Sequence, residues 1–112
     1  MKVFNTYFYE VSKGTKPAAL LTCESILLEK ILPKLQKANI SYFVQNLSAS
    51  KANIFFGRKE CIEVVEKFLN KPLDKLSLYE DFILGVILGY DTVLQCKRLL
   101  DRDEILKSIK TA

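Results

Sequence analysis

Apolar and polar positions along the chain follow two periods, and these divide it into helices and strands. Residues 24–38 place leucine or isoleucine every three or four positions, which predicts an amphipathic helix. Residues 18–23 form a short apolar run between turn residues, which predicts a buried strand. Residues 40–47 and 52–57 are aromatic and β-branched and flank a serine-containing turn, so together they predict a β-hairpin.

The longest apolar run, residues 82–90, predicts the central helix of the protein. Ser77 followed three residues later by Glu80 has the form of a capping box, which begins a helix. We expect this helix to continue to residue 100, and because it is apolar almost all round it must be covered on more than one side. Another helix is predicted over residues 59–70.

The two ends of the chain have weaker patterns. Residues 3–13 fit both the apolar face of a helix and the alternation of a strand, so both structures remain open. Gly14 followed by Pro17 ends this element. Residues 103–112 can add two helical turns, and we expect this tail to fray.

The order of the elements predicts an α+β fold. A strand, a helix, two strands and a helix make a two-layer split βαβ unit, whose three-stranded sheet has the order 1-3-2. The strand at 52–57 is then central, and its lack of strict alternation indicates cover on both faces. A long C-terminal apolar helix completes the fold, and residues 1–112 form a single domain.

The composition excludes several kinds of chemistry. The sequence has no histidine, which excludes Ser-His and Cys-His nucleophiles and imidazole metal sites. Gly85 and Gly89 lie within a predicted helix, where they allow close packing on the sheet or on a second subunit, and form no phosphate loop. We therefore expect no cofactor and no metal.

Charge and hydropathy indicate a soluble cytoplasmic protein. The first residues do not have the pattern of a signal peptide, and an apolar run of nine residues, 82–90, is far below the ~20 that span a bilayer. The net charge of +4 comes from lysines that alternate with acids, without the clustering of a nucleic-acid footprint. We expect neither membrane nor nucleic-acid binding.

The three cysteines are widely separated, which suits a reducing compartment. Cys23 and Cys61 each lie near the start of a predicted helix, where the helix dipole can lower the pKa of a thiol. The alternative is that they are buried as small apolar side chains. We expect the cysteines to be structural.

Several strings of residues are similar to one known family. They are Tyr9-Glu10 with Lys13, the strand 53–57, and above all residues 80–91 with Gln95. The chain resembles an uncharacterised bacterial family, a domain of unknown function that is often encoded beside flavodoxin genes. The resemblance brings no established activity, but it makes flavodoxin a possible partner.

We expect a non-enzymatic binding or regulatory module that forms a homodimer and binds flavodoxin or another acidic protein. The candidate binding surface comprises the following residues: Tyr9, Glu10, Lys13, Asn53, Glu80, Tyr90, Asp91 and Gln95.

The alternative is a small enzyme that acts on a small molecule. Its pocket would lie near Tyr90 and Asp91, with Gln95 and either Cys96 or Glu80 beside it. Such an enzyme needs a concave pocket that Tyr90 and Asp91 both line.

Overall fold

A computed structural model describes residues 1–111, with the side chains of residues 1–108. Its centre is a three-stranded antiparallel sheet of β1 (Ala18–Glu24), β2 (Ser41–Asn46) and β3 (Lys51–Gly57) in the order β1-β3-β2. The predicted strands, the hairpin and the order 1-3-2 are confirmed. β3 is central and almost entirely buried, which explains why its sequence is apolar on both faces.

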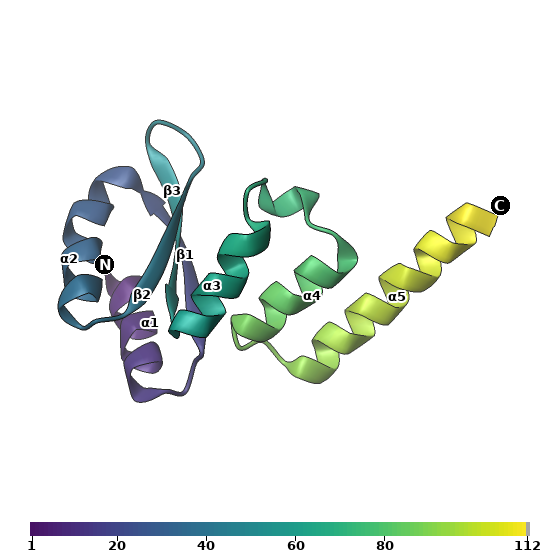
Figure 1. The fold of residues 1–112 in the computed structure, drawn as a ribbon, viewed down its shortest axis with the longest axis horizontal. Coiled ribbons are helices and arrows are strands. Elements are labelled where there is room, and N and C mark those ends of the chain that lie inside the picture. Colours follow the sequence, from purple (N-terminus) through teal and green to yellow (C-terminus); the bar gives the residue numbers. More distant parts are fainter. Residues whose placement is uncertain (112) are drawn as a thin grey trace.

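Helices cover both faces of the sheet (Figure 1). α1 (Lys2–Lys13) and α2 (Leu28–Lys37) pack on one face, whereas α3 (Lys59–Phe68) and α4 (Leu78–Ile87) cover the other. The prediction of two layers is therefore wrong, because the fold has three.

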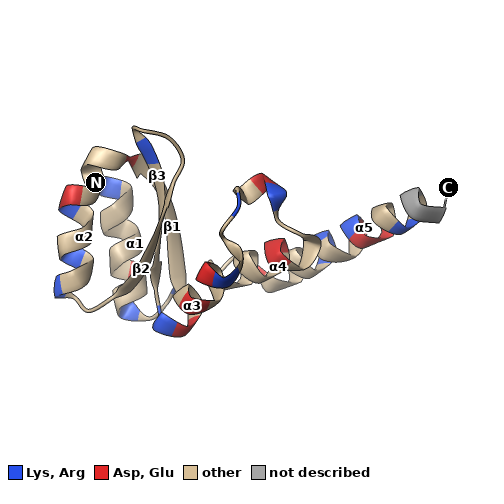
Figure 2. Ribbon diagram, turned by 45° about the horizontal axis from the view of Figure 1, so that its top comes forward, with Lys and Arg blue, Asp and Glu red and all other residues tan. Residues whose placement is uncertain are grey.

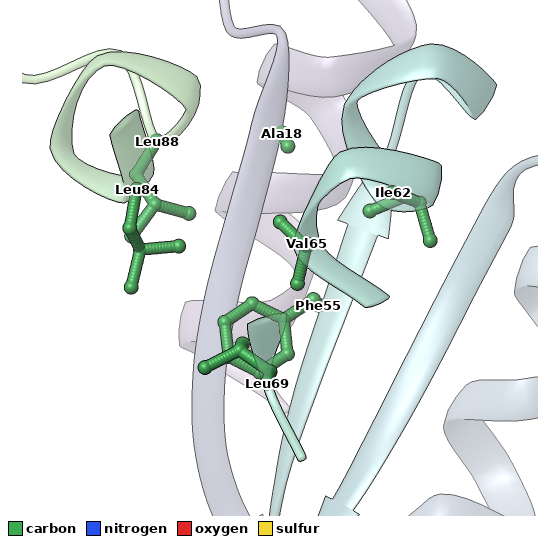
Figure 3. Packing of buried hydrophobic residues seen from close by; sticks show 7 residues of the cluster. All are labelled: Ala18, Phe55, Ile62, Val65, Leu69, Leu84 and Leu88. Carbon is green, nitrogen blue, oxygen red and sulfur yellow. The ribbon is translucent and has the colours of Figure 1, made fainter. Parts of the chain in front are cut away.

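Neighbouring side chains of β3 enter the two cores in turn. Ile54 and Phe56 pack with α1 and α2. Phe55 lies beside Val65 and Leu69 in the cluster to which Leu84 of α4 also belongs (Figure 3). The three side chains of β3 are fully buried. This alternation follows from the pleat of a strand, in which successive side chains point to opposite faces.

The ambiguous N-terminal segment is the helix α1. Phe4 is buried and its ring centroid lies 5.6 Å from that of Phe8 and 5.4 Å from that of Phe56 on the sheet. Phe4 and Phe8 lie about one turn apart on the same face of the helix, and this brings their rings together. The helix ends at Gly14, whose φ of 82° is left-handed and favours glycine.

The predicted single helix over 77–100 is wrong. α4 ends at Ile87, and a separate helix, α5 (Thr92–Thr111), runs back along it. Gly89 adopts a φ of 77°. The N–H of Tyr90 donates to the carbonyl of Gly85 and that of Gly89 to Val86, which is the Schellman pattern of a helix end.

α5 is also different in character from the predicted apolar helix. It carries charged residues along its length, and the uniformly apolar run lies in α4. Residues 103–111 continue α5 as helix. Within the described residues, no helix is both long and apolar enough to cross a membrane.

Short 3-10 turns join the remaining elements. η1 (Ser25–Leu27) leads from β1 into α2, and η2 (Leu73–Lys75) leads from α3 toward α4. Asn39 follows α2 with a left-handed φ of 57°, a conformation that asparagine tolerates at the end of a helix.

Candidate functional site

The eight residues of the predicted binding surface do not form one site. The structure places them in three groups, on α1, in the sheet, and on the α4–α5 hairpin, as follows: Tyr9, Glu10 and Lys13; Asn53; and Glu80, Tyr90, Asp91 and Gln95. The groups on α1 and on the hairpin lie on opposite sides of the sheet (Figure 1).

Asn53 is the buried centre of a polar ladder that runs across all three strands. Its neighbours in register are Thr22 on β1 and Gln45 on β2. Its Oδ1 accepts from the Thr22 hydroxyl, its Nδ2 donates to Gln45 Oε1 at 3.0 Å, and Gln45 Nε2 donates to the carbonyl of Lys71 at 2.9 Å. These hydrogen bonds hold the loop after α3 to the sheet, so Asn53 has a structural role.

Glu80 also holds the fold together. It closes the predicted capping box, since its Oε1 accepts from the N–H of Ser77 at 2.8 Å while the Ser77 hydroxyl accepts from the N–H of Glu80. Lys71 pairs with the same carboxylate at 2.6 Å. The hydrogen bond from Lys71, followed by that from Ser77, lowers the pKa of Glu80.

Asp91 begins α5 as its N-terminal cap. Its Oδ1 accepts from the N–H of Leu94 at 2.8 Å. A cavity of about 190 Å³ lies beside the hairpin and is lined by Tyr90, Gln95 and Arg98, but not by Asp91. It is smaller than the ~300 Å³ at the lower end of ligand pockets. The cavity that Tyr90 lines therefore does not include Asp91, although the enzyme hypothesis needs a pocket that both line.

Gln95 joins the two helices of the hairpin. It is 4% exposed, and a Cβ on Gly85 would lie 2.5 Å from its Oε1. Residue 85 is therefore a glycine because the Gln95 side chain of α5 packs against it. The predicted close packing on the sheet or on a second subunit is not needed to explain it. The same Oε1 accepts from Arg98 at 3.1 Å.

A pair of arginines holds α5 to the start of α4. Asp81 Oδ2 accepts from Arg102 at 3.0 Å and pairs with Arg98 at 3.4 Å. All three side chains are half-buried. The polar groups around the cavity thus bind one another.

The α1 group lies on a different kind of surface. Tyr9 is 62% exposed, and the Lys13 ammonium lies 5.4 Å from the centroid of its ring. The main chain of Glu10 helps to end α1, because its carbonyl accepts from both the N–H and the hydroxyl of Thr15. Tyr9 and Lys13 are therefore available to a partner.

A long trough runs beside Tyr9 and Lys13. A hollow of about 570 Å³ between α1 and α2 is lined by Phe8 and Tyr9 and edged by Lys34 and Lys37. A second, of about 550 Å³, shares Ser12 and Ala38 with the first and continues to the start of α3. We call the two together the basic trough, after the cations that line it: Lys13, Lys34, Lys37, Arg58 and Lys59.

Lys34, Lys37, Arg58 and Lys59 were not among the predicted site residues, although the sequence contains a signal for them. Residues 1–58 carry eight Lys and Arg but three Asp and Glu, whereas residues 59–112 carry nine and ten. The net charge of +4 is thus not spread evenly, because Lys and Arg outnumber Asp and Glu only in the first half of the chain, whose basic positions are blue in Figure 2. That half forms most of the trough. Such asymmetry between halves is typical of a charged binding surface.

The cysteines are free thiols, each half-buried. Burial raises the pKa of Cys23, and the neighbouring Glu24 raises it further. Burial and then Glu60 likewise raise the pKa of Cys61. The helix starts therefore do not activate these thiols.

We expect slow labelling of Cys23 and Cys61 in the native protein. Thiolate is the reacting species, and a raised pKa leaves less of it at neutral pH. The labelling rate should rise about tenfold for each pH unit and level off only above the usual thiol pKa of ~8.5. Stopped-flow labelling with a chromogenic disulfide measures this, and a native rate above that of the unfolded chain at pH 7 contradicts it.

These features define a small α+β domain with a basic trough on one side and a helical hairpin on the other. Among the described residues, no cluster of three or more acidic or cysteine side chains could hold a metal ion. The chain belongs to the family described as protein of unknown function (DUF2023), whose model matches residues 2–102. No curated protein matches the chain.

Proposed function

We propose that the protein is a small non-enzymatic binding module that docks on an acidic protein through the basic trough. The observation that carries this proposal is the charge asymmetry, with eight basic and three acidic residues in the half that forms most of the trough. A predominantly positive surface steers a negatively charged partner and raises the rate of association.

The trough also offers apolar contact. Phe8 and Tyr9 of α1 line it together with Lys34 and Lys37 of α2. Exposed aromatic side chains are enriched at the centres of protein interfaces, and charges at their rims supply orientation. The surface thus suits a protein partner better than a free anion.

We propose flavodoxin as the partner and the cytoplasm as the place of the encounter. The support is the resemblance of residues 80–91 and 53–57 to a bacterial family encoded beside flavodoxin genes. Flavodoxin is an acidic flavoprotein, so its charge complements the trough.

Titration of flavodoxin with the protein tests the proposal. We expect binding at ~10 mM salt that weakens at least tenfold at ~150 mM, because the Debye length falls from about 30 to about 8 Å. Replacing both Lys34→Glu and Lys37→Glu should weaken low-salt binding by a further tenfold or more, since both are exposed cations of the trough.

A matched control separates the trough from net charge. The double variant Lys67→Glu with Lys75→Glu makes the same change at two exposed lysines outside the trough, and it should bind nearly as well as the wild type. Absence of binding at low salt refutes flavodoxin as the partner. Equal losses in the two double variants refute the trough as the site.

A further inference from the structure

β2 is an edge strand, and its outer side is open. It pairs with β3, and no strand of the described chain pairs with its other side. Exposed edge strands pair readily with other chains, so proteins usually protect them with charged residues, proline or a bulge. β2 contains no charged residue and no proline, and its register with β3 runs without a bulge. We call this unprotected side of β2 the open edge.

The other edge of the sheet, formed by β1, is different. Pro17 precedes β1, and Glu24 is its last residue. The turn between α4 and α5 also lies close to it, since a Cβ on Gly89 would be 3.6 Å from the Pro17 ring. β1 thus has a proline and a charge of the kind that protect an edge, whereas β2 has neither.

The hydrogen bonds show which main-chain groups face the open edge. The N–H of Leu47 donates to the carbonyl of Lys51 at 3.0 Å, and these two residues continue the register of β2 with β3. In an antiparallel pair, residues that bond to the partner strand alternate with residues whose main chain points away from it. Two and four residues before Leu47, Gln45 and Phe43 therefore bond to β3. The residues that direct their N–H and C=O groups to the open edge are Tyr42, Val44 and Asn46.

These groups can pair with the same groups of a second copy. When two β2 strands lie antiparallel about a two-fold axis at Val44, Tyr42 of each is opposite Asn46 of the other, and Val44 is opposite Val44. An axis at any other residue leaves one of the three without a partner in β2. In a two-fold contact the pair of Tyr42 with Asn46 forms twice. The main chain of the open edge is thus complementary to itself.

Two hollows lie along the open edge. The start hollow, of about 520 Å³, lies at the first residues of β2 beside Ile62 of α3, and the end hollow, of about 500 Å³, lies at its last residues beside Leu69. Leu47 lines the end hollow and is 49% exposed. In the pairing about Val44, Leu47 of each copy is opposite Ser41 of the other, which lines the start hollow. Each copy therefore places an apolar side chain where the other has space.

The helix beside the open edge fits the same arrangement. α3 contacts both β2 and β3. Opposite residues of an antiparallel pair point to one face, so the two α3 helices of a joined sheet lie on the same face. They are then about two strand spacings, or ~10 Å, apart, which is close to the distance between packed helices. The second copy thus extends both the sheet and the helical layer that covers it.

We propose that the open edge binds a second copy of this chain, which joins the two three-stranded sheets into one continuous sheet with a two-fold axis at Val44. The dimer pairs main-chain groups that one copy leaves to water, and it covers Leu47. The open edge borders the basic trough, because Ser41 and Lys59 line both the start hollow and the trough. The inference does not rest on the partner proposed for the trough, and its test uses the protein alone.

Sedimentation equilibrium between ~1 and ~100 μM tests the dimer, over a range that covers ordinary affinities. We expect the wild type to dimerise. Val44→Pro should weaken the dimer at least a hundredfold, since it removes an outward N–H that β3 does not use, as prolines on edge strands do. Glu24→Pro is the matched control. It removes an outward N–H at the end of β1, where φ is already −67°, and should leave the dimer unchanged.

A second pair of variants tests the side-chain contact. Leu47→Asp should weaken the dimer at least tenfold, because it places a charge in the start hollow of the other copy. Ile26→Asp makes the same kind of change at an apolar residue outside β2 that is 67% exposed, and it should have no effect. Circular dichroism checks that the variants stay folded. A wild type that is monomeric at ~100 μM, or losses in the two controls equal to those in the variants, overturns the proposal.

Hydrogen exchange of the wild type locates the contact without any substitution. The amides of Tyr42 and Val44 should exchange at least tenfold more slowly when the protein is dimeric than when dilution makes it monomeric. The amides of Leu20 and Thr22, which point outward on β1, should exchange at the same rate in both. A dimer in which the Val44 amide exchanges as fast as in the monomer refutes the open edge as the interface.

Discussion

Gly57→Ala is expected to lower the free energy of unfolding by about 3 kcal/mol, at the upper end of the cost of overpacking a core. Gly57 ends β3 and lies opposite Ala18 of β1. A Cβ there would lie 2.5 Å from the Ala18 Cα and still closer to the carbonyl oxygen of Pro17. These are main-chain atoms, so they cannot turn aside as the end of a side chain can.

The strain would fall on the pairing of β1 with β3. The same Pro17 carbonyl accepts from the N–H of Arg58 at 2.9 Å, and a shift of β1 would lengthen this bond. For a domain of this size about 3 kcal/mol corresponds to a fall in Tm of ~10–20 °C. Thermal unfolding followed by circular dichroism measures it.

Gly14→Ala is the control for this variant. It adds the same methyl group at a glycine that has no atom within 4 Å of the new Cβ, so only the left-handed φ of 82° is strained. That strain costs about 1 kcal/mol. If Gly57→Ala proves no less stable than Gly14→Ala, the close approach of β1 and β3 at this point is wrong.

The sheet could be predicted because its signals are local. The turn residues at 48–51 predict the hairpin of β2 and β3. The strand at 52–57 is apolar on both faces, which predicts a central position, and the strand at 18–23 pairs with its free edge. The capping box could be predicted for the same reason, because Ser77 and Glu80 lie within one helical turn.

The break in the predicted long helix has a local signal in the sequence. Gly89 inside an apolar run suggests close packing, but glycine is also typical of the end of a helix. Asp91, two residues later, caps the start of the next helix. A helix end followed directly by a helix start divides the run into α4 and α5. The two glycines therefore have separate roles: Gly85 leaves room for the Gln95 side chain, and Gly89 adopts a left-handed φ.

The structural roles of the predicted site residues depend on contacts between residues that are far apart in the sequence. Gln45, Asn53 and Thr22 meet only because the three strands take this register, and no short string shows it. The basic trough likewise joins the ends of α1 and α2 to the start of α3. The charge asymmetry was visible in the sequence, but its location on one surface required the fold.

Asn53→Asp is expected to destabilise the protein by about 3 kcal/mol at neutral pH while leaving its shape almost unchanged. Asn53 is 2% exposed, and the amide nitrogen that donates to Gln45 would become a second carboxylate oxygen. A buried charge without a cationic partner is strongly unfavourable. A surface residue in a binding site would not show this effect.

The loss should depend on pH with a definite sign. Burial raises the pKa of the new carboxyl in the folded state above the ~3.9 of the unfolded chain, so the penalty is full above the folded pKa and fades as the pH falls through it. Chemical unfolding between pH 4 and 8 should therefore show the variant approaching the wild type toward acid. Asn46→Asp makes the same change at the exposed end of β2 and should have little effect at any pH. A small, pH-independent loss for Asn53→Asp would contradict the burial of Asn53 at the centre of the ladder. Unchanged stability with weaker partner binding would return Asn53 to the binding surface.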